Sequence, residues 1–341
     1  MSSPSPVPIS GPTGYGLMSL TVRPKPIPYE QAFAAINNAI ADGVTFLNGG
    51  EFYGINVFNP DPTVEKKPYE NLKLIKAYFE KYPENRSKVT VSIKGCLGAK
   101  GPDCSPEGVK RSIENIASYF PENKFDLFET GRMDHSVSVE DFIKSVIPFI
   151  ERGTIKGISL SEVNANTIRR AAAVYPISCV EVELSLWSTD ILFNGVMDTC
   201  KELGIPVIAY SPLGRGYLTG SIKSVDDLDK ADYRRSFDRF ASQEAIDANK
   251  SIIDNIAKFA KAKNATLAQI ALSWVRSFSE YPEKYPTVIP IPSASTAERN
   301  HENNTHIKLS KAEFDELTNL VTNQKIYGGR YAAMFEPHLN G

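Results

Sequence analysis

Short apolar runs alternate with amphipathic patterns along most of this chain, and this alternation constrains the fold more than any other feature. Eight runs have the length and composition of buried strands, and they span residues 14–18, 45–48, 89–94, 125–129, 157–161, 179–184, 207–211 and 287–291. Between them, apolar residues recur at the spacing of one helix face, as Leu72, Ile75 and Phe79 do. Strands and helices in regular alternation predict a parallel sheet connected by crossover helices.

The number of runs favours a closed barrel over an open sheet. Eight strands, with polar residues gathered where strands end, are typical of a (β/α)8 TIM barrel whose active site lies at the C-terminal face. The stretches GYGLMS and GRGYLTG lack the third glycine of a dinucleotide-binding fingerprint, which weakens the case for an open Rossmann sheet. We therefore expect one α/β domain over residues 1–341, with a mobile arm at 1–12, a long insert after the seventh strand at 219–262, and extra C-terminal helices, including a helix and tail at 310–341.

Composition argues against several other classes of protein. The formal net charge of -2 gives no electrostatic footprint for nucleic acid or for a membrane surface, and no run approaches the ~18 apolar residues of a membrane span. The first residues lack the basic and apolar stretches of a secretory signal. Four cysteines and four histidines without metal-ligand spacing predict reduced thiols and no metal site. We expect a cytoplasmic protein, with the nucleus as a further location, that is a monomer or a weak homo-oligomer.

A tyrosine and a lysine mark the exits of two neighbouring runs. Tyr53 lies five residues after Asn48, where the second run ends, and Lys94 ends the third run. An ammonium close to a phenol favours the phenolate and lowers the tyrosine pKa from ~10. Such a pair can protonate an alkoxide near neutral pH, although each residue alone is common at a strand end.

The motifs around these residues resemble those of the aldo-keto reductases, from about residue 14 to residue 321. TFLNGGEFYG is similar to the family's D-T-A-x-x-Y-G, and SIKG is similar to its lysine strand. The resemblance implies a barrel that binds NADPH or NADP+ and reduces a carbonyl group, with Tyr53 as proton donor and Lys94 lowering its pKa. Asn48 completes the implied catalytic set, in place of the family's aspartate, by accepting a hydrogen bond from Lys94. Without that carboxylate, the pKa of Lys94 should be somewhat lower.

Further motifs are similar to the family's cofactor site. GYGLMSL, IKGISLSEV, CVEVELSLWS, IAYSPLGRG and IPIPSASTAERNHEN each match a segment of it. The resemblance implies that Tyr210 stacks on the nicotinamide ring. The other implied contacts are Leu17 and Met18 by the ribose, Ser161 and Glu162 at the carboxamide, Glu181 where the family has glutamine, Ser211, Leu213 and Arg215 along the pyrophosphate, Ser293, Ser295 and Arg299 at the 2′-phosphate, and Glu302 and Asn303 at the adenine. A polar loop entering a helix also suits a phosphate on physical grounds, an ordinary solvated helix start being the alternative.

Two departures narrow the resemblance. Asn48 replaces the aspartate, and Gly131 stands where the family has a histidine. Together with GEFYG, LSEV and ELSLWS, these changes are most like the fungal pyridoxal reductase subgroup. The resemblance implies NADPH-dependent reduction of an aldehyde to an alcohol, with pyridoxal giving pyridoxine. Gly131, Arg132 and Trp187 would line the substrate pocket, and Arg132 would act as a donor to the carbonyl oxygen if its side chain turns inward. The alternatives are a solvated loop arginine at 132 and simple aromatic packing at Trp187.

Two other functions fit the same residues. One is general reduction of aromatic or aliphatic aldehydes, and the other is an NADPH-binding redox sensor with little turnover. Loss of the histidine and aspartate is compatible with the sensor, whereas Tyr53 and Lys94 favour chemistry. The segment 232–240 interleaves arginine with aromatic residues, as some nucleic-acid sites do, but the net charge opposes this and we interpret it as a loop over the cofactor.

Overall fold

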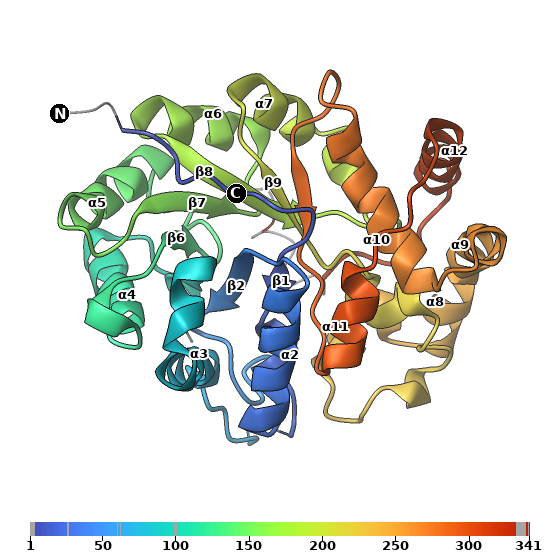
Figure 1. Cartoon of the computed structure of the whole chain (residues 1–341), viewed down its shortest axis with the longest axis horizontal. Helices are drawn as coiled ribbons and strands as arrows, with labels where there is room; N and C mark the ends of the chain where they lie inside the picture. Colours follow the sequence, from blue (N-terminus) through green and yellow to red (C-terminus); the bar gives the residue numbers. More distant parts are fainter. Residues whose placement is uncertain are drawn as a thin grey trace.

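Eight parallel strands form the centre of the molecule (Figure 1). The computed structural model describes residues 4–25, 27–59, 61, 63–98, 101–331, 339 and 341. The strands are β1 (Tyr15–Gly16), β2 (Phe46–Gly50), β3 (Thr90–Gly95), β6 (Leu127–Thr130), β7 (Gly157–Ser161), β8 (Ile177–Glu183), β9 (Val207–Tyr210) and β10 (Val288–Pro290). They lie side by side in chain order, and every pair is parallel.

The ring closes between the first and last strands. The backbone N–H of Gly14 donates to the Pro290 carbonyl at 2.9 Å, and that of Gly16 donates to the Pro292 carbonyl at 3.1 Å. A Cβ at position 16 would lie 2.9 Å from the carbonyl oxygen of Ile291, so glycine is what permits this close approach. The predicted TIM barrel is confirmed.

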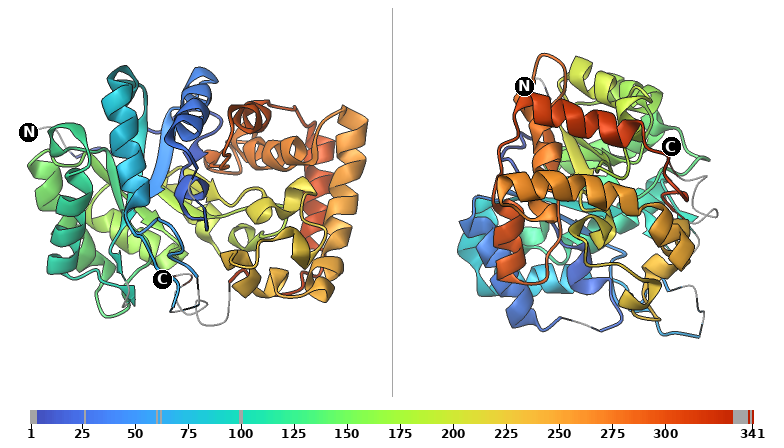
Figure 2. Two further views of the ribbon diagram at one scale, coloured as in Figure 1. Left: turned by 90° about the horizontal axis from the view of Figure 1, so that it is seen from below. Right: turned by 90° about the vertical axis from the view of Figure 1, so that its right-hand side faces the viewer.

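Helices surround the barrel (Figures 1 and 2). They are α1 (Met18–Thr21), α2 (Tyr29–Ala41), α3 (Glu70–Lys81), α4 (Pro106–Ala117), α5 (Val139–Glu151), α6 (Ala165–Val174), α7 (Val196–Leu203), α8 (Gln243–Ala248), α9 (Lys250–Lys263), α10 (Leu267–Ser277), α11 (Ala297–Asn304) and α12 (Lys311–Thr322). The predicted stripe of Leu72, Ile75 and Phe79 on α3 is buried. Removing such side chains from water stabilises the fold by about 1.5–3 kcal/mol each.

Three segments depart from the expected elements or add to them. β1 is shorter than the predicted run at 14–18, because the chain turns into α1 at Met18. A small hairpin of β4 (Leu97–Gly98) and β5 (Gly101–Pro102) follows β3. The insert at 219–262 folds as short 3-10 turns followed by α8 and most of α9.

The N-terminal segment crosses the end of the barrel nearest the viewer in Figure 1, where the strands begin. The Val7 N–H donates to Ser178 Oγ at 3.0 Å, and Thr45 Oγ1 donates to the Ser10 carbonyl at 2.7 Å. Val7 and Ile9 also pack against the apolar cluster at this end. The mobility of residues 1–12 stays a prediction, and residues 1–3 lie outside the described ranges.

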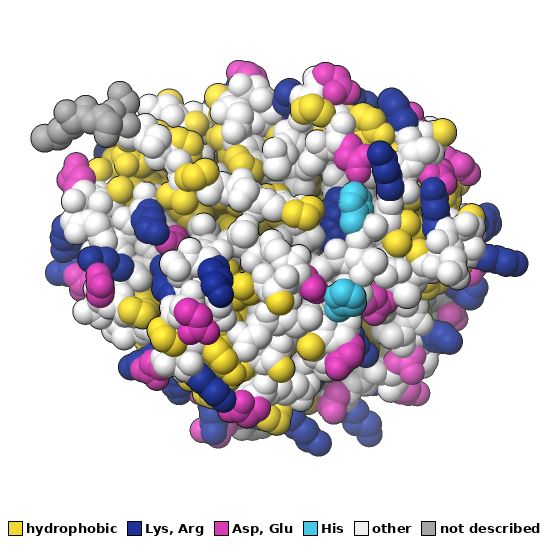
Figure 3. Space-filling view, in the orientation of Figure 1, with side chains coloured by type: hydrophobic (Ala, Val, Ile, Leu, Met, Phe, Trp, Pro, Cys, Tyr) yellow, Lys and Arg dark blue, Asp and Glu magenta, His cyan; other side chains and the backbone are white. Residues whose placement is uncertain are grey.

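Charged side chains of both signs are interspersed over this face (Figure 3). Within the described ranges, no helix combines the length and apolar character needed to cross a bilayer. The same residues contain no group of three or more Cys, His, Asp or Glu side chains placed to hold a metal ion. Cys96, Cys104, Cys179 and Cys200 are buried free thiols.

Candidate active site

Tyr53 and Lys94 meet at the C-terminal ends of β2 and β3. Gly50, the last residue of β2, pairs in register with Lys94. The Tyr53 N–H donates to the Gly50 carbonyl at 3.2 Å, and a Cβ at Gly50 would lie 2.8 Å from the Tyr53 ring. Glycine therefore allows the tyrosine to fold back over the strand end, where Lys94 Nζ lies 6.0 Å from its ring centroid. Both residues are buried.

Lys94 is surrounded by an amide and two carboxylates. Its Nζ donates to Asn48 Oδ1 at 2.6 Å, as the sequence analysis expects. The same Nζ lies 2.7 Å from Glu181 and 3.0 Å from Glu129. Asn48 Nδ2 donates to Glu181 Oε2 at 2.6 Å and to Glu129 Oε1 at 3.2 Å. Four strands, β2, β3, β6 and β8, thus bring one cluster of polar groups together inside the barrel.

The structure contradicts two expected pKa shifts, the lowering of the Lys94 pKa and the lowering of the Tyr53 pKa. Burial acts to lower the pKa of Lys94, but the charges of Glu129 and Glu181 outweigh it and hold that pKa well above its usual range. The expectation of a lowered Lys94 pKa is wrong, because β6 and β8 supply the carboxylates that Asn48 lacks. Burial also raises the pKa of Tyr53 to about 12 despite the opposing ammonium, so Tyr53 keeps its proton at neutral pH.

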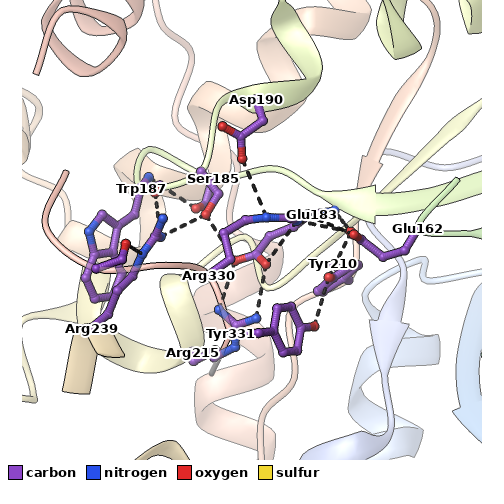
Figure 4. Close-up of polar contacts among 12 residues, drawn as sticks. Glu162, Glu183, Ser185, Trp187, Asp190, Tyr210, Arg215, Arg239, Arg330 and Tyr331 are labelled. Atoms are coloured by element: carbon purple, nitrogen blue, oxygen red, sulfur yellow. Dashed lines mark hydrogen bonds and ion pairs between the residues drawn. The ribbon is translucent and has the colours of Figure 1, made fainter. Parts of the chain in front are cut away.

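A second polar cluster includes residues from the C-terminal segment (Figure 4). The Tyr210 hydroxyl donates to Glu162 Oε1 at 2.9 Å and lies 2.9 Å from the Tyr331 hydroxyl. Arg330 donates to both oxygens of Glu162, at 2.9 and 3.1 Å. Tyr210 and Glu162, expected at the nicotinamide, are therefore in contact with residues that follow α12.

Arg215, expected along the pyrophosphate, pairs with a carboxylate instead. It donates to both oxygens of Glu183, at 2.9 and 3.0 Å, and its guanidinium lies 4.7 Å from the centre of the Tyr331 ring (Figure 4). Arg330 Nη1 reaches Glu183 Oε2 at 3.4 Å. Ser211 and Leu213 lie between β9 and Arg215, in the turn that leads to this pair.

Ser161 keeps an unpaired hydroxyl at the end of β7. Its Oγ is buried and has no hydrogen-bond partner among the described residues. A buried polar group without a partner is rare and marks a position where a ligand can complete the bonding. Leu17 and Met18 lie after β1, where the Leu17 N–H donates to the Asn48 carbonyl at 2.8 Å. Leu17 and Met18 after β1 and Ser161 at the end of β7 therefore all lie at the C-terminal end of the barrel.

The residues expected at the 2′-phosphate and adenine lie around α11. Ser293 and Ser295 precede this helix, Thr296 caps it, and Arg299 is exposed in its first turn. Ser293 Oγ also lies 2.5 Å from Ser19 Oγ. The other two expected residues, Glu302 and Asn303, are in the last turn of the helix.

Gly131 follows β6, where the Phe52 ring occupies the adjacent space. A Cβ at position 131 would lie 2.8 Å from Phe52 Cε1. The neighbouring Arg132 turns inward, because its Nη2 donates to the Tyr331 hydroxyl at 3.2 Å. Donation from Arg132 to a substrate carbonyl stays a prediction.

Comparison with known proteins agrees with this geometry. The sequence model of the Aldo/keto reductase family matches residues 12–322. The chain belongs to this family. The family reduces carbonyl groups with NAD(P)H. "Probable pyridoxal reductase 2" of Schizosaccharomyces pombe is 37% identical over 339 residues, which is 97% of each chain. "Putative pyridoxal reductase" of Saccharomyces cerevisiae is 38% identical over 348 residues, covering 94% of this chain and 95% of the yeast protein.

Two solved structures share the fold of this aldo/keto reductase. A glycerol dehydrogenase from Gluconobacter oxydans has a TM-score of 0.74 at 16% identity, covering 97% of this chain and 93% of that one. An aldo/keto reductase from Klebsiella pneumoniae, in complex with NADP and acetate, has a TM-score of 0.65 at 18% identity and covers 94% of each chain. At these identities the likeness shows the barrel.

Trp187, expected in the substrate pocket of the reductase, is almost fully buried. Its ring stacks on Tyr217 with centroids 4.3 Å apart, and the Arg239 guanidinium lies 4.9 Å from its centre. Arg239 also donates to the Trp187 carbonyl at 2.7 Å, while Arg234 donates to the Arg215 carbonyl at 2.7 Å. Arg234 and Arg239 of segment 232–240 thus form internal contacts, and the interpretation of this segment as a loop over the cofactor stays a prediction.

Sequence reasoning missed several residues of this reductase's site. They are Phe52, Glu129, Glu183, Arg330 and Tyr331. A signal was present for the two glutamates, because an acidic residue inside an apolar run must find a buried partner. No comparable signal marks Arg330 and Tyr331, which follow the last helix in a stretch without periodicity.

Proposed function

We propose that this aldo/keto reductase reduces an aldehyde to an alcohol with NADPH, and that its preferred substrate is pyridoxal, giving pyridoxine. The observation that carries the proposal is the buried pair of Tyr53 and Lys94 at the C-terminal end of the barrel. A proton donor held beside a fixed cation is what protonation of a developing alkoxide requires.

The groups at this end of the barrel fit a nicotinamide cofactor. The unpaired Ser161 Oγ is free to hydrogen-bond to the carboxamide. Arg299, in the first turn of α11, suits a 2′-phosphate and so favours NADPH over NADH. When bound, the reduced cofactor supplies the hydride. Glu162 and Tyr210 contact Arg330 and Tyr331 in this structure, so cofactor binding would exchange those contacts.

Tyr53 supplies the proton in the proposed reaction. Because burial raises its pKa to about 12, the phenol is protonated near neutral pH, yet it is still a stronger acid than the alcohol that forms. Its proton passes to the alkoxide oxygen. The Lys94 ammonium, fixed by its buried partners, then stabilises the phenolate left behind.

An arc of aromatic rings beside Tyr53 supports an aromatic substrate. The rings contact one another in the order Tyr53, Phe52, Phe58, Tyr233, Phe237 and Tyr331, with successive centroids 4.9 to 6.3 Å apart. Flat apolar walls of this kind suit a planar ring. Arg132 adds a polar group by its contact with the Tyr331 hydroxyl.

Pyridoxal has the chemistry that this site favours. It is an aromatic aldehyde, and in its open form a phenolic hydroxyl lies beside the carbonyl. That hydroxyl can donate an internal hydrogen bond to the aldehyde oxygen and replace part of what a histidine at position 131 would supply. The names of the S. pombe and S. cerevisiae relatives point to the same substrate.

A steady-state screen tests the proposal. Purified protein is given NADPH with pyridoxal, pyridoxal phosphate, benzaldehyde or a simple ketone, and loss of reduced-nicotinamide absorbance is followed. We expect repeated turnover, with the highest kcat/KM for pyridoxal and slower reaction with NADH. Similar kcat/KM values for all aldehydes would indicate a general aldehyde reductase, and a single slow burst would indicate a redox sensor.

A further inference from the structure

Two buried glutamates converge on the one lysine of the catalytic cluster. Glu129 is 0% exposed and Glu181 is 2% exposed. Lys94 Nζ lies 3.0 and 2.7 Å from them, and Asn48 Nδ2 donates to both. Glu129 Oε2 also accepts from Ser159 Oγ at 2.9 Å. The carboxyl groups therefore belong to a fully bonded network rather than to a chance contact.

The charges in this network do not balance when both glutamates are ionised. One ammonium would then face two carboxylates in a dry interior, which leaves an excess negative charge. Two carboxyl groups that share a site normally retain one proton between them. Burial, together with the charge of Glu129 and a hydrogen bond to it, raises the pKa of Glu181 to about 8 against the opposing effect of Lys94. The pair therefore holds a proton at neutral pH.

We propose that Glu181, together with Glu129, positions Lys94 and stores the proton that restores Tyr53 after each reduction. This inference rests on the function proposed above. Asn48 is the neutral link, because its amide joins both glutamates to Lys94 without adding a third acid.

The proton balance of this step is simple. After Tyr53 has given its proton to the alkoxide oxygen, the Lys94 ammonium first stabilises the phenolate and then, as the product leaves, passes it a proton. Lys94 takes the proton held by the Glu129–Glu181 pair and becomes a cation again. The pair is then doubly ionised beside that cation, and a proton taken up from bulk solvent restores it, so each turnover consumes one solvent proton. No protein group is oxidised or reduced.

Other titratable groups near the pair fix the expected pH dependence. Lys94 on β3 and Glu129 on β6 act directly on Glu181. The charges of Lys94, Glu129 and Glu181 also act on Tyr53 and Cys179. Burial holds the pKa of Cys179 well above its usual range. We therefore expect the raised pKa of Glu181, about 8, to shape the pH profile just above neutral pH.

Two isosteric substitutions give opposite expectations for the pH profile of kcat. In the wild type, kcat for aldehyde reduction should fall as the pH rises through about 8, because Glu181 loses its proton. Glu181→Gln should lower kcat and move this fall to higher pH, toward the titration of Tyr53. Glu129→Gln should move the fall to lower pH, because Glu129 no longer raises the pKa of Glu181. The control Glu202→Gln changes a surface glutamate paired with Arg169 and should leave the profile unchanged.

Moving the carboxylate provides a rescue test. Asn48→Asp alone should lower kcat, because it places a third acid beside Lys94. Asn48→Asp/Glu181→Gln restores two acids and should recover part of the kcat that Glu181→Gln loses. NADPH affinity and circular dichroism show whether each variant is folded. If every folded variant keeps the wild-type pH profile, the stored-proton role is wrong.

Infrared spectroscopy separates failure of this inference from failure of the proposed function. A protonated carboxyl group and a carboxylate absorb infrared light at different frequencies, and this difference does not depend on whether the enzyme is active. We expect a protonated-carboxyl band at neutral pH that disappears as the pH rises through about 8 and is absent in Glu181→Gln. If the band is present but no aldehyde is reduced, the proposed function fails, and with it the catalytic role of the stored proton. If aldehydes are reduced but no such band titrates, this inference alone is overturned.

Discussion

The ring of Phe52 fills the space into which a side chain at Gly131 would project. A Cβ at position 131 would lie 2.8 Å from Phe52 Cε1 and 3.0 Å from Cζ. Phe52 also packs edge-on against the Tyr53 ring, with centroids 4.9 Å apart. An aromatic wall thus stands beside Tyr53, the proposed proton donor, at the position where the sequence resemblance implies a histidine. We expect added polarisation of the substrate carbonyl to come from Arg132 or from the substrate itself.

A hydroxyl next to the aldehyde should therefore accelerate reduction. We expect 2-hydroxybenzaldehyde to have a higher kcat/KM than benzaldehyde, because its hydroxyl can donate an internal hydrogen bond to the carbonyl oxygen. A preorganised donor can contribute ~2.7–4 kcal/mol, so even a partial effect is measurable. Steady-state rates with NADPH test this, and 4-hydroxybenzaldehyde controls for electronic effects. An equal or higher kcat/KM for benzaldehyde would remove the internal hydrogen bond from the account.

Gly131→His should not restore a histidine donor by itself. The new side chain would collide with the Phe52 ring, and overpacking of this kind typically costs about 1–3 kcal/mol. We expect a lower melting temperature and a lower kcat for the single variant. Gly131→His/Phe52→Ala should recover stability and narrow the difference between the two benzaldehydes. A fully stable single variant would show that the Phe52 ring moves aside at little cost.

Much of this site could be predicted because its groups stand at strand ends. The alternation of runs placed Tyr53 and Lys94 at adjacent exits, and a parallel barrel brings such exits to one face. The same logic failed for the pKa of Lys94, which was expected to be lowered and is raised. Its carboxylate partners come from β6 and β8, and which inward side chains meet across a barrel depends on register and shear rather than on local pattern.

The C-terminal contacts could not be predicted for a different reason. Arg330 and Tyr331 contact Glu162 and Tyr210, which lie more than a hundred residues earlier in the chain. The stretch that carries them has neither helical nor strand periodicity, so local pattern does not say where it packs. The sequence marks Gly131 as a departure from the histidine of the family motif, but only the position of the Phe52 ring explains why a small residue is needed there.

Arg299 should determine preference for the phosphorylated cofactor. Arg299→Ala is expected to weaken NADPH binding by ~1.5–3 kcal/mol, the range for hydrogen bonds to charged groups, and to leave NADH binding nearly unchanged. Fluorescence titration with each cofactor measures both affinities. Arg169→Ala, on a surface helix, is the matched control. Equal losses for NADPH and NADH would show that Arg299 does not contact the 2′-phosphate.

Arg330 should stabilise the fold in a pH-dependent way. Burial acts to raise the pKa of Glu162, but Arg330, with smaller contributions from Arg132 and Tyr210, outweighs it and holds that pKa below its usual range. A depressed carboxyl pKa stabilises the folded state above the unfolded pKa of ~4.3, and this contribution disappears as the pH falls through the folded value. Arg330→Ala should therefore lower the free energy of unfolding by about 3–5 kcal/mol at neutral pH, and by less in acid.

Chemical denaturation of the wild type and of Arg330→Ala at several pH values checks this expectation. Arg169→Ala breaks an exposed pair with Glu202 and should cost at most about 1 kcal/mol at neutral pH. A difference between wild type and Arg330→Ala that grows as the solution is acidified would contradict the assigned pairing of Arg330 with Glu162.

Tyr53 is the proposed proton donor of a multiple-turnover aldehyde reductase, and the Tyr53→Phe variant isolates the contribution of its hydroxyl. The substitution keeps the buried ring and removes only the hydroxyl. With pyridoxal and NADPH, kcat should fall by about 10²–10⁴-fold, the usual contribution of general acid catalysis, while NADPH affinity stays at the wild-type value. If kcat falls by less than about tenfold in a variant that still binds NADPH, Tyr53 is not the proton donor.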